Sequence, residues 1–121
     1  MSETFAKSAR LLTPGQFKRV FSRSRRVQDS LFIVRVRYAA QDHPRLGLAI
    51  SKRHARMAVQ RNRIKRCVRE AFRHLADTLR AGDYVVINAP QAARASKTDL
   101  HRSIATLLVL VGKKTAGSQP D

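Results

Sequence analysis

The segment from Lys52 to Arg69 limits the possible folds more than any other part of the chain, because it joins dense positive charge to a helical apolar pattern. Eight of its eighteen residues are Lys or Arg, and no Asp or Glu occurs between Asp42 and Glu70. From about residue 58 onward, apolar residues recur at the i, i+3, i+4, i+7 spacing of one helix face. They are Ile64, Cys67, Val68, Ala71, Phe72 and Leu75. The segment therefore predicts a long helix with one buried face and one cationic face.

The cationic face of this predicted helix has an unusual distribution of charge. It carries Asn62, Arg66, Arg69 and Arg73, with Arg61, Arg63 and Lys65 at its sides. A solvated helix face usually mixes acids and bases, which attract each other at i, i+4. Here the like charges of Arg61 and Lys65 occupy that spacing, and a polyanion would relieve their repulsion. We favour contact with nucleic acid, and an ordinary solvated face is the alternative.

The charge of the whole chain supports the same interpretation. Its 121 residues include 25 Lys and Arg against 8 Asp and Glu, which gives a formal net charge of +17 and a sequence pI of about 11.7. Such a balance is typical of proteins that bind nucleic acid or another anionic surface. The length predicts a single domain over residues 1–121, with an ordered core at about 10–112 and flexible tails.

Neither a membrane span nor an export signal is predicted. No run approaches the roughly 18 apolar residues of a membrane span, and the N-terminal residues lack the long apolar segment of a signal peptide. We therefore expect a cytoplasmic protein with no membrane partner. The single cysteine, Cys67, lies on the apolar stripe, so we expect a core residue rather than a disulfide partner or a nucleophile.

Helix signals occur near both ends of the chain. Thr13 and Gln16 match a capping box with Pro14 at the first helical position, and a short helix would carry Phe17, Val20 and Phe21 on one side. A last helix is predicted to open at Ser96 or Thr98. Its apolar stripe would be Leu100, Ile104, Leu107, Leu108 and Val111. The stop of the long central helix is predicted at residues 81–83, which include Gly82.

Three segments are predicted to be strands. Residues 31–38 alternate with period two, residues 45–51 form the second strand, and residues 84–89 are apolar enough for a central strand. Residues 22–30 are predicted to be a basic linker. The order is helix, strand, strand, helix, strand, helix, so we expect a small α/β sandwich around one sheet.

A groove is a possible product of this arrangement. On the first strand, Ile33 and Arg35 share one face, and the second strand would place small residues on the same side if the two strands pair. Phe17 and Phe21 of the first helix would then either line a groove in which an unpaired base stacks or simply belong to the core, which base rates favour. An exposed sheet face with extended arginines is the alternative for Arg35.

Catalytic chemistry is not predicted for the polypeptide. The histidines lack metal-ligand spacing, the acids form no cluster that would hold Mg²⁺, and the glycines form no phosphate loop. We therefore expect no active site on the chain itself.

Several motifs resemble the bacterial ribonuclease P protein subunit in its proteobacterial form. They are S-K-R at residues 51–53, R-N-R-I-K-R-x-x-R-E-x-F-R at residues 61–73, R-L-L-T-P-x-Q-F-x-x-V-F at residues 10–21 and H-P-R-L-G-L at residues 43–48. The resemblance runs from about residue 10 to residue 110. It implies an α/β sandwich with a left-handed crossover between parallel strands, although right-handed crossovers are the usual rule.

The resemblance also implies partners and sites. In the family an RNA subunit is the catalyst and removes the 5′ leader of precursor tRNA with Mg²⁺, while the protein binds no cofactor tightly and is expected to be monomeric alone. The residues implied to contact the RNA subunit are Arg53, Arg56, Arg61, Asn62, Arg63, Lys65, Arg66 and Arg69. Those implied to line a cleft for the single-stranded leader are Arg10, Phe17, Phe21, Ile33, Arg35, Ser51 and Lys52.

Two points of the resemblance stay open. Some members of the family have an aromatic residue where this chain has Arg35, which indicates a phosphate contact there rather than stacking. Family members also bind metal ions near the cleft, but no ligands are assigned here. The alternatives to this function are another structural RNA-binding protein, such as a ribosomal protein, and a nuclease that acts without an RNA subunit.

Overall fold

The computed structural model describes residues 13–41 and 43–113. Arg10 and the predicted flexible tails lie outside these residues. The strands are β1 (Arg25–Gln28), β2 (Phe32–Tyr38), β3 (Arg45–Ala49) and β4 (Gly82–Asn88). The helices are α2 (Pro14–Ser22), α3 (Ala58–Leu75) and α4 (Lys97–Gly112), with short 3-10 helices η1 (Ala76–Thr78) and η2 (Pro90–Arg94).

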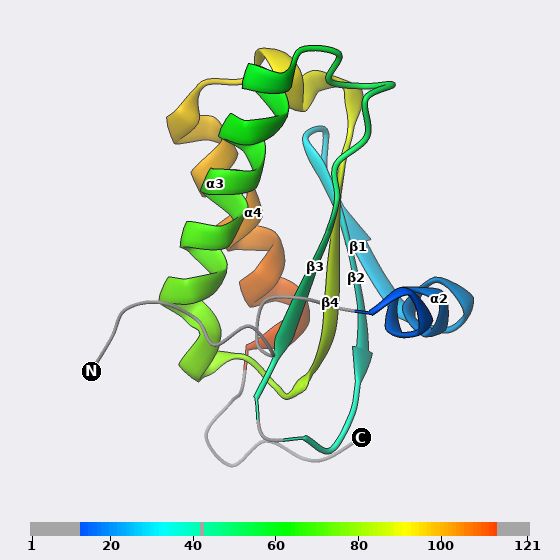
Figure 1. The fold of residues 1–121 in the computed structure, drawn as a ribbon. Helices are drawn as coiled ribbons and strands as arrows, with labels where there is room; N and C mark the ends of the chain where they lie inside the picture. Colours follow the sequence, from blue (N-terminus) through cyan, green and yellow to red (C-terminus); the bar gives the residue numbers. More distant parts are fainter. Residues whose placement is uncertain (1–12, 42, 114–121) are drawn as a thin grey trace.

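The strands form one mixed sheet in the order β1-β2-β4-β3. β4 pairs antiparallel with β2 and parallel with β3, so it is the central strand that its apolar sequence predicts. α3 and α4 cover one face of the sheet, and α2 lies on the other (Figure 1). The predicted α+β sandwich is therefore confirmed. α3 connects the parallel neighbours β3 and β4, and the left-handed sense of this crossover stays a prediction.

The face under α3 and α4 holds the main hydrophobic core. Phe32, Val34 and Val36 point into it from β2, and each is at most 1% exposed. The predicted apolar stripes of α3 and α4 pack against these side chains. Phe72 of α3 meets Tyr84 of β4 edge to face, with 5.7 Å between ring centroids.

The opposite face is covered by α2 alone and holds a much smaller cluster. Val20 of α2 packs on Val85 of β4, and both are fully buried. Phe17, Ala49 and Ile87 surround this pair but remain half-buried. The two faces of the sheet therefore differ greatly in how much apolar surface they bury.

The predicted capping box fixes the start of α2. The backbone N–H of Gln16 donates to Oγ1 of Thr13 at 3.2 Å, and Oε1 of Gln16 accepts from the N–H of Thr13 at 2.7 Å. This reciprocal pair satisfies two donors that the first turn of a helix leaves without partners. α2 therefore begins at a defined residue beside the sheet.

The prediction of an irregular linker over residues 22–30 is wrong. Arg25–Gln28 form the edge strand β1, which pairs antiparallel with β2. Oδ1 of Asp29 accepts from the N–H groups of Leu31 and Phe32 at 2.8 and 3.0 Å and closes the turn between the strands. Its Oδ2 accepts from the Ser103 hydroxyl at 2.5 Å, which ties the hairpin to α4.

Three further details of the prediction are corrected. α3 ends at Leu75 and continues into η1, whereas Gly82, predicted to stop the helix, opens β4. A Cβ at Gly82 would lie 2.7 Å from the carbonyl oxygen of Arg37, so glycine is needed for the close approach of the two strands. β3 ends at Ala49 rather than at residue 51, and β2 begins at Phe32 rather than at Leu31, which packs against the main core.

Candidate nucleic-acid interface

α3 presents its basic residues at the surface, as its sequence predicts. Asn62, Arg63, Arg66 and Arg69 are exposed, and Arg61 and Lys65 are half-buried at the edges of the helix. The loop that precedes α3 adds two exposed arginines. We call these eight residues the α3 surface: Arg53, Arg56, Arg61, Asn62, Arg63, Lys65, Arg66 and Arg69.

The α3 surface forms no ion pair with a carboxylate in the part of the chain that the structure describes. Among the described residues, ion pairs join Arg45 to Asp83 and His101 to Glu70, each with an N···O distance of 2.9 Å. Glu70, the acid nearest to the cationic segment in sequence, is thus engaged by α4. The hydrogen bond from His101 lowers the pKa of Glu70. The α3 surface keeps its positive charge, which suits a polyanion.

Two arginines of the α3 surface bond to protein backbone. Nη1 of Arg61 donates to the carbonyl oxygens of Ala55 and Arg56 at 2.9 and 2.7 Å. Nη2 of Arg63 donates to the carbonyl oxygen of Ala93, in η2, at 2.8 Å. These bonds were not predicted, because sequence spacing shows which face a side chain occupies but not which carbonyl it reaches.

The predicted cleft residues of α2 and β2 lie together. The rings of Phe17 and Phe21 are 6.4 Å apart between centroids and 15° from parallel. The guanidinium carbon of Arg35 lies 5.6 Å from the centroid of the Phe21 ring, within the range of a cation–π contact. Arg35 also donates to Oγ of Ser24 at 3.0 Å and to the carbonyl oxygen of Phe21 at 3.4 Å. The arginine is therefore held beside the aromatic pair.

Of the other predicted cleft residues, Ile33 lies on this side of the sheet. Ser51 and Lys52 follow the end of β3, and Asn88, the partner of Ser51, shares the sheet face of Phe32 instead. Ile33 is the partner of Ile87 in β4, and Ile87 is the partner of Ala49 in β3. Ser51 follows two residues later, and its N–H donates to Oδ1 of Asn88 at 2.7 Å. Lys52 is exposed in the next position. We call four of the predicted cleft residues the α2-side surface: Phe17, Phe21, Ile33 and Arg35. That an RNA strand binds here stays a prediction.

The small residues of β3 lie on the predicted side, although β2 and β3 are not neighbours. Arg35 of β2, Val85 of β4 and Gly47 of β3 are partners across the ladder and therefore share one face. The element that approaches this face is α2 itself, because Ala49 packs against the cluster of Val20 and Val85.

Sequence reasoning missed one arginine of this face. Arg26 of β1 is the cross-strand partner of Arg35, so both side chains leave the sheet on the same side, and Arg26 is exposed. Only the alternation of Val27 with polar neighbours could have indicated a strand there. The α2 side of the sheet is therefore more cationic than the sequence suggested.

The described residues offer binding groups rather than reactive groups. Among residues 13–41 and 43–113, no cluster of three or more His, Cys, Asp and Glu could hold a metal ion. Cys67 is buried as expected, and burial raises the pKa of its thiol, which disfavours the nucleophilic thiolate. Burial also raises the pKa of Tyr84. No helix in the described ranges is long and apolar enough to span a membrane.

Comparisons with known proteins agree on one family. The family model described as Ribonuclease P matches residues 5–112. The ribonuclease P protein component of Nitrosococcus oceani is 41% identical over 100 residues, which cover 83% of this chain and 84% of the relative. That of Aliivibrio fischeri is 37% identical over 117 residues, or 97% of this chain and all of the relative.

Solved structures show the same likeness in three dimensions. The RNase P protein of Staphylococcus aureus superposes with a TM-score of 0.79 at 30% identity, covering 86% of this chain and 95% of that one. The RNase P protein of Thermotoga maritima gives a TM-score of 0.72 at 28% identity, covering 82% and 94%.

The fold and the two cationic surfaces define a small α+β protein of the nucleic-acid-binding class. The family match over residues 5–112 and the relatives near 40% identity make the assignment specific. The chain belongs to the family of bacterial ribonuclease P protein components and is a subunit of the endoribonuclease that matures the 5′ end of tRNA. This assignment replaces the alternatives of a ribosomal protein and of a nuclease without an RNA subunit.

Proposed function

We propose that the chain supports leader removal through two surfaces with different RNA partners. The α3 surface binds the catalytic RNA subunit, and the α2-side surface binds the single-stranded 5′ leader of precursor tRNA. The observation that carries this proposal is that α3 and α2 lie on opposite faces of one sheet (Figure 1). One small domain thus has the geometry to hold the ribozyme and its substrate at the same time.

The α3 surface is suited to the phosphates of a folded RNA. Its exposed arginines present planar guanidinium groups, which match phosphate oxygens in a two-point geometry. Because no described carboxylate is paired with them, RNA phosphates would be the groups that compensate their charge. Binding would release counterions from the RNA, so affinity would fall steeply as salt rises.

The α2-side surface is suited to an unpaired strand. Phe21 is 41% exposed and lies next to the half-buried Phe17, so part of its ring is accessible to a base. Stacking of this kind contributes about 1–3 kcal/mol per base and tolerates any sequence. Arg35 is fixed beside the ring and would contact a phosphate of the same strand.

The chemistry of cleavage is assigned to the RNA subunit, which would use Mg²⁺. We assign no metal ligand to the protein and no catalytic residue. The protein alone is proposed to be a monomer and to act in the cytoplasm, where its proposed substrate is made. Its contribution to the reaction would be charge and geometry.

Reconstitution tests this function. Mixed with a bacterial ribonuclease P RNA at low Mg²⁺, the protein is expected to restore cleavage of precursor tRNA at the leader junction, because its cations replace part of the screening that Mg²⁺ supplies. RNA alone at the same Mg²⁺ and protein alone are the controls. Cleavage by the protein without RNA, or no gain over RNA alone, would contradict the proposal.

A further inference from the structure

The bonds of Arg61 and Arg63 tie the first turns of α3 to two neighbouring segments. Arg61 reaches the loop before α3, and Arg63 reaches η2. Neither segment has long regular structure, so such side-chain contacts help to fix its position. The two bonds therefore point to a structural task for guanidinium groups within the α3 surface.

The carbonyl that Arg63 binds is one that η2 cannot satisfy itself. Within η2, the carbonyl oxygens of Ala89 and Ala92 accept from the N–H groups of Ala92 and Ala95 at 3.1 and 3.2 Å. The carbonyl of Ala93 lies in the last turn, where helix carbonyls have no partner inside the helix. The charged N–H of Arg63 supplies that partner and makes a stronger bond than a neutral donor would.

A buried side chain holds η2 at the neighbouring position. Ala92 is fully buried, so η2 is anchored by apolar packing at one residue and by the bond from Arg63 at the next. The loop before α3 has the same arrangement, because Ala55 is 1% exposed and its carbonyl accepts from Arg61. In both segments an exposed arginine comes directly after the anchored alanines: Arg94 in η2 and Arg56 in the loop.

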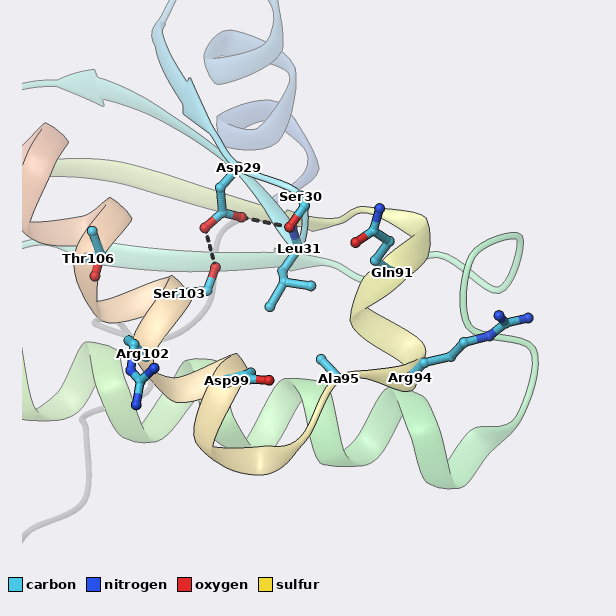
Figure 2. A pocket seen from close by; sticks show the side chains of 10 residues that line it. All are labelled: Asp29, Ser30, Leu31, Gln91, Arg94, Ala95, Asp99, Arg102, Ser103 and Thr106. Carbon is cyan, nitrogen blue, oxygen red and sulfur yellow. Dashed lines mark hydrogen bonds between the residues drawn. The ribbon is translucent and has the colours of Figure 1, made fainter.

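Arg94 is therefore a cation held in place beside α3. η2, the β1–β2 turn and α4 enclose an open pocket of about 640 Å³, and Arg94 is one of its lining residues. Figure 2 shows the Arg94 side chain extending away from this pocket, while Arg102 lies at its other end. η2 contacts α3 and lies at the end of the molecule where that helix begins (Figure 1).

We propose that Arg94 binds a phosphate of the RNA subunit next to the α3 surface and that Arg63 differs from the other arginines of that surface: its guanidinium is engaged by the Ala93 carbonyl, and it acts as the positioning residue that fixes Arg94 there. This inference rests on the proposed function and extends it to a segment outside α3. A cation on a fixed segment loses less conformational freedom on binding than one on a mobile segment, so the bond from Arg63 strengthens the contact of Arg94.

A double-mutant cycle in RNA-subunit binding tests the proposal. Affinity is measured against salt for the wild type, Arg94→Gln, Arg63→Gln and the double variant. Arg94→Gln is expected to weaken binding about three- to tenfold and to make the slope of log K against log salt shallower by about 0.7–0.9, the value for one lost phosphate contact. In the Arg94→Gln background, Arg63→Gln is expected to reduce the affinity for the RNA subunit much less than it does in the wild type.

Amide hydrogen exchange in the free protein separates positioning from direct contact. Arg63→Gln is expected to speed exchange at the N–H groups of Ala92 and Ala95, because η2 loses one of its anchors. A residue that only contacts RNA would leave this exchange unchanged. Circular dichroism and thermal unfolding confirm that the variants remain folded.

The matched control is Arg102→Gln, which removes the same charge at the other end of the pocket and is expected to change affinity by less than about twofold. Wild-type affinity in Arg94→Gln would overturn the contact, and additive losses in the cycle would overturn the positioning role. If Arg66→Gln still weakened binding in either case, the proposed function would stand. Absence of RNA binding by the wild type would instead contradict the proposed function.

Discussion

The two faces of the sheet bury very different amounts of apolar surface. Under α3 and α4, alternate side chains of β2 and β4 are buried in the main core. On the α2 side, the apolar cluster consists of the buried pair Val20 and Val85, and Phe17, Ala49 and Ile87, which pack against it, are half-buried. The difference predicts that the face under α3 and α4 contributes most of the stability, whereas the α2 side keeps the accessible surface that we propose for the leader.

The largest expected effect is a difference in unfolding free energy between variants on the two faces of the sheet. Phe72→Ala removes a fully buried ring that packs on Tyr84, so it is expected to lower the free energy of unfolding by about 3–5 kcal/mol. Phe17→Ala removes a half-buried ring and is expected to cost less than half as much. Urea unfolding measures both values, and equal losses would show that the two faces contribute alike.

The next effect concerns the α3 surface, which lies on the solvent side of the helices that cover the main core. Charge reversal at Arg66 and Arg69 together is expected to weaken binding of the RNA subunit more than tenfold and to flatten the salt dependence by about one unit per lost contact. Stability is expected to change little, because both side chains are exposed. The control is Lys113→Glu, an exposed charge reversal at the end of α4. An unchanged slope in the α3 variant would reject these contacts.

A smaller effect is expected for the substrate at the α2 side. In the reconstituted holoenzyme, Phe17→Ala is expected to weaken the binding of precursor tRNA by about 1–3 kcal/mol, the contribution of one stacked base. Binding of mature tRNA is expected to change less, because only the precursor carries a leader. Arg35→Gln is the companion variant, since it removes the neighbouring cation and leaves both rings. Equal losses of affinity for precursor and mature tRNA would show that Phe17 acts only as a core residue.

The smallest effect concerns the β1–β2 hairpin, which Asp29 ties to α4. Burial alone would raise the pKa of Asp29, but hydrogen bonds from Ser103, Phe32 and Leu31 outweigh it and lower the pKa below its ordinary value of 3.8. The carboxylate therefore stabilises the fold above pH 3.8, and that contribution is lost as the pH falls through the lowered pKa.

Asp29→Asn tests this directly. The variant is expected to lose about 1 kcal/mol of unfolding free energy at pH 7, where the wild type has the charged acceptor. The difference should shrink in acid, as the wild-type carboxyl becomes neutral like the amide. Unfolding curves at pH 7 and pH 3 give both values, and a difference that does not depend on pH would contradict the role of the charge.

Local patterns predicted most elements of this fold. The alternation of Phe32, Val34 and Val36 and the apolar stripe of α3 matched the buried faces because each reflects the repeat of its own element. β1 was not predicted because it is an edge strand, in which polar residues are common. Its one apolar residue, Val27, packs against the core and makes too short a pattern to indicate a strand. Its strand conformation comes from pairing with β2, which a local pattern does not encode.

The sequence indicated the residues of the candidate site but not their arrangement. The motifs indicated which side chains to consider, and the structure brings Phe17, Phe21 and Arg35 into contact as that set requires. The insertion of β4 between β2 and β3, and the bonds of Arg61 and Arg63 to backbone carbonyls, depend on tertiary packing. Such contacts join residues far apart in sequence, where no spacing rule applies.

The proposal that the two surfaces bind different RNA partners is tested most directly by one ratio. In holoenzyme assembled with saturating protein, the affinity for precursor tRNA is divided by that for mature tRNA, for Phe17→Ala and for Arg66→Glu. The structure predicts that the ratio falls toward one for Phe17→Ala and keeps its wild-type value for Arg66→Glu. The same ratio in both variants would contradict a separate surface for the leader.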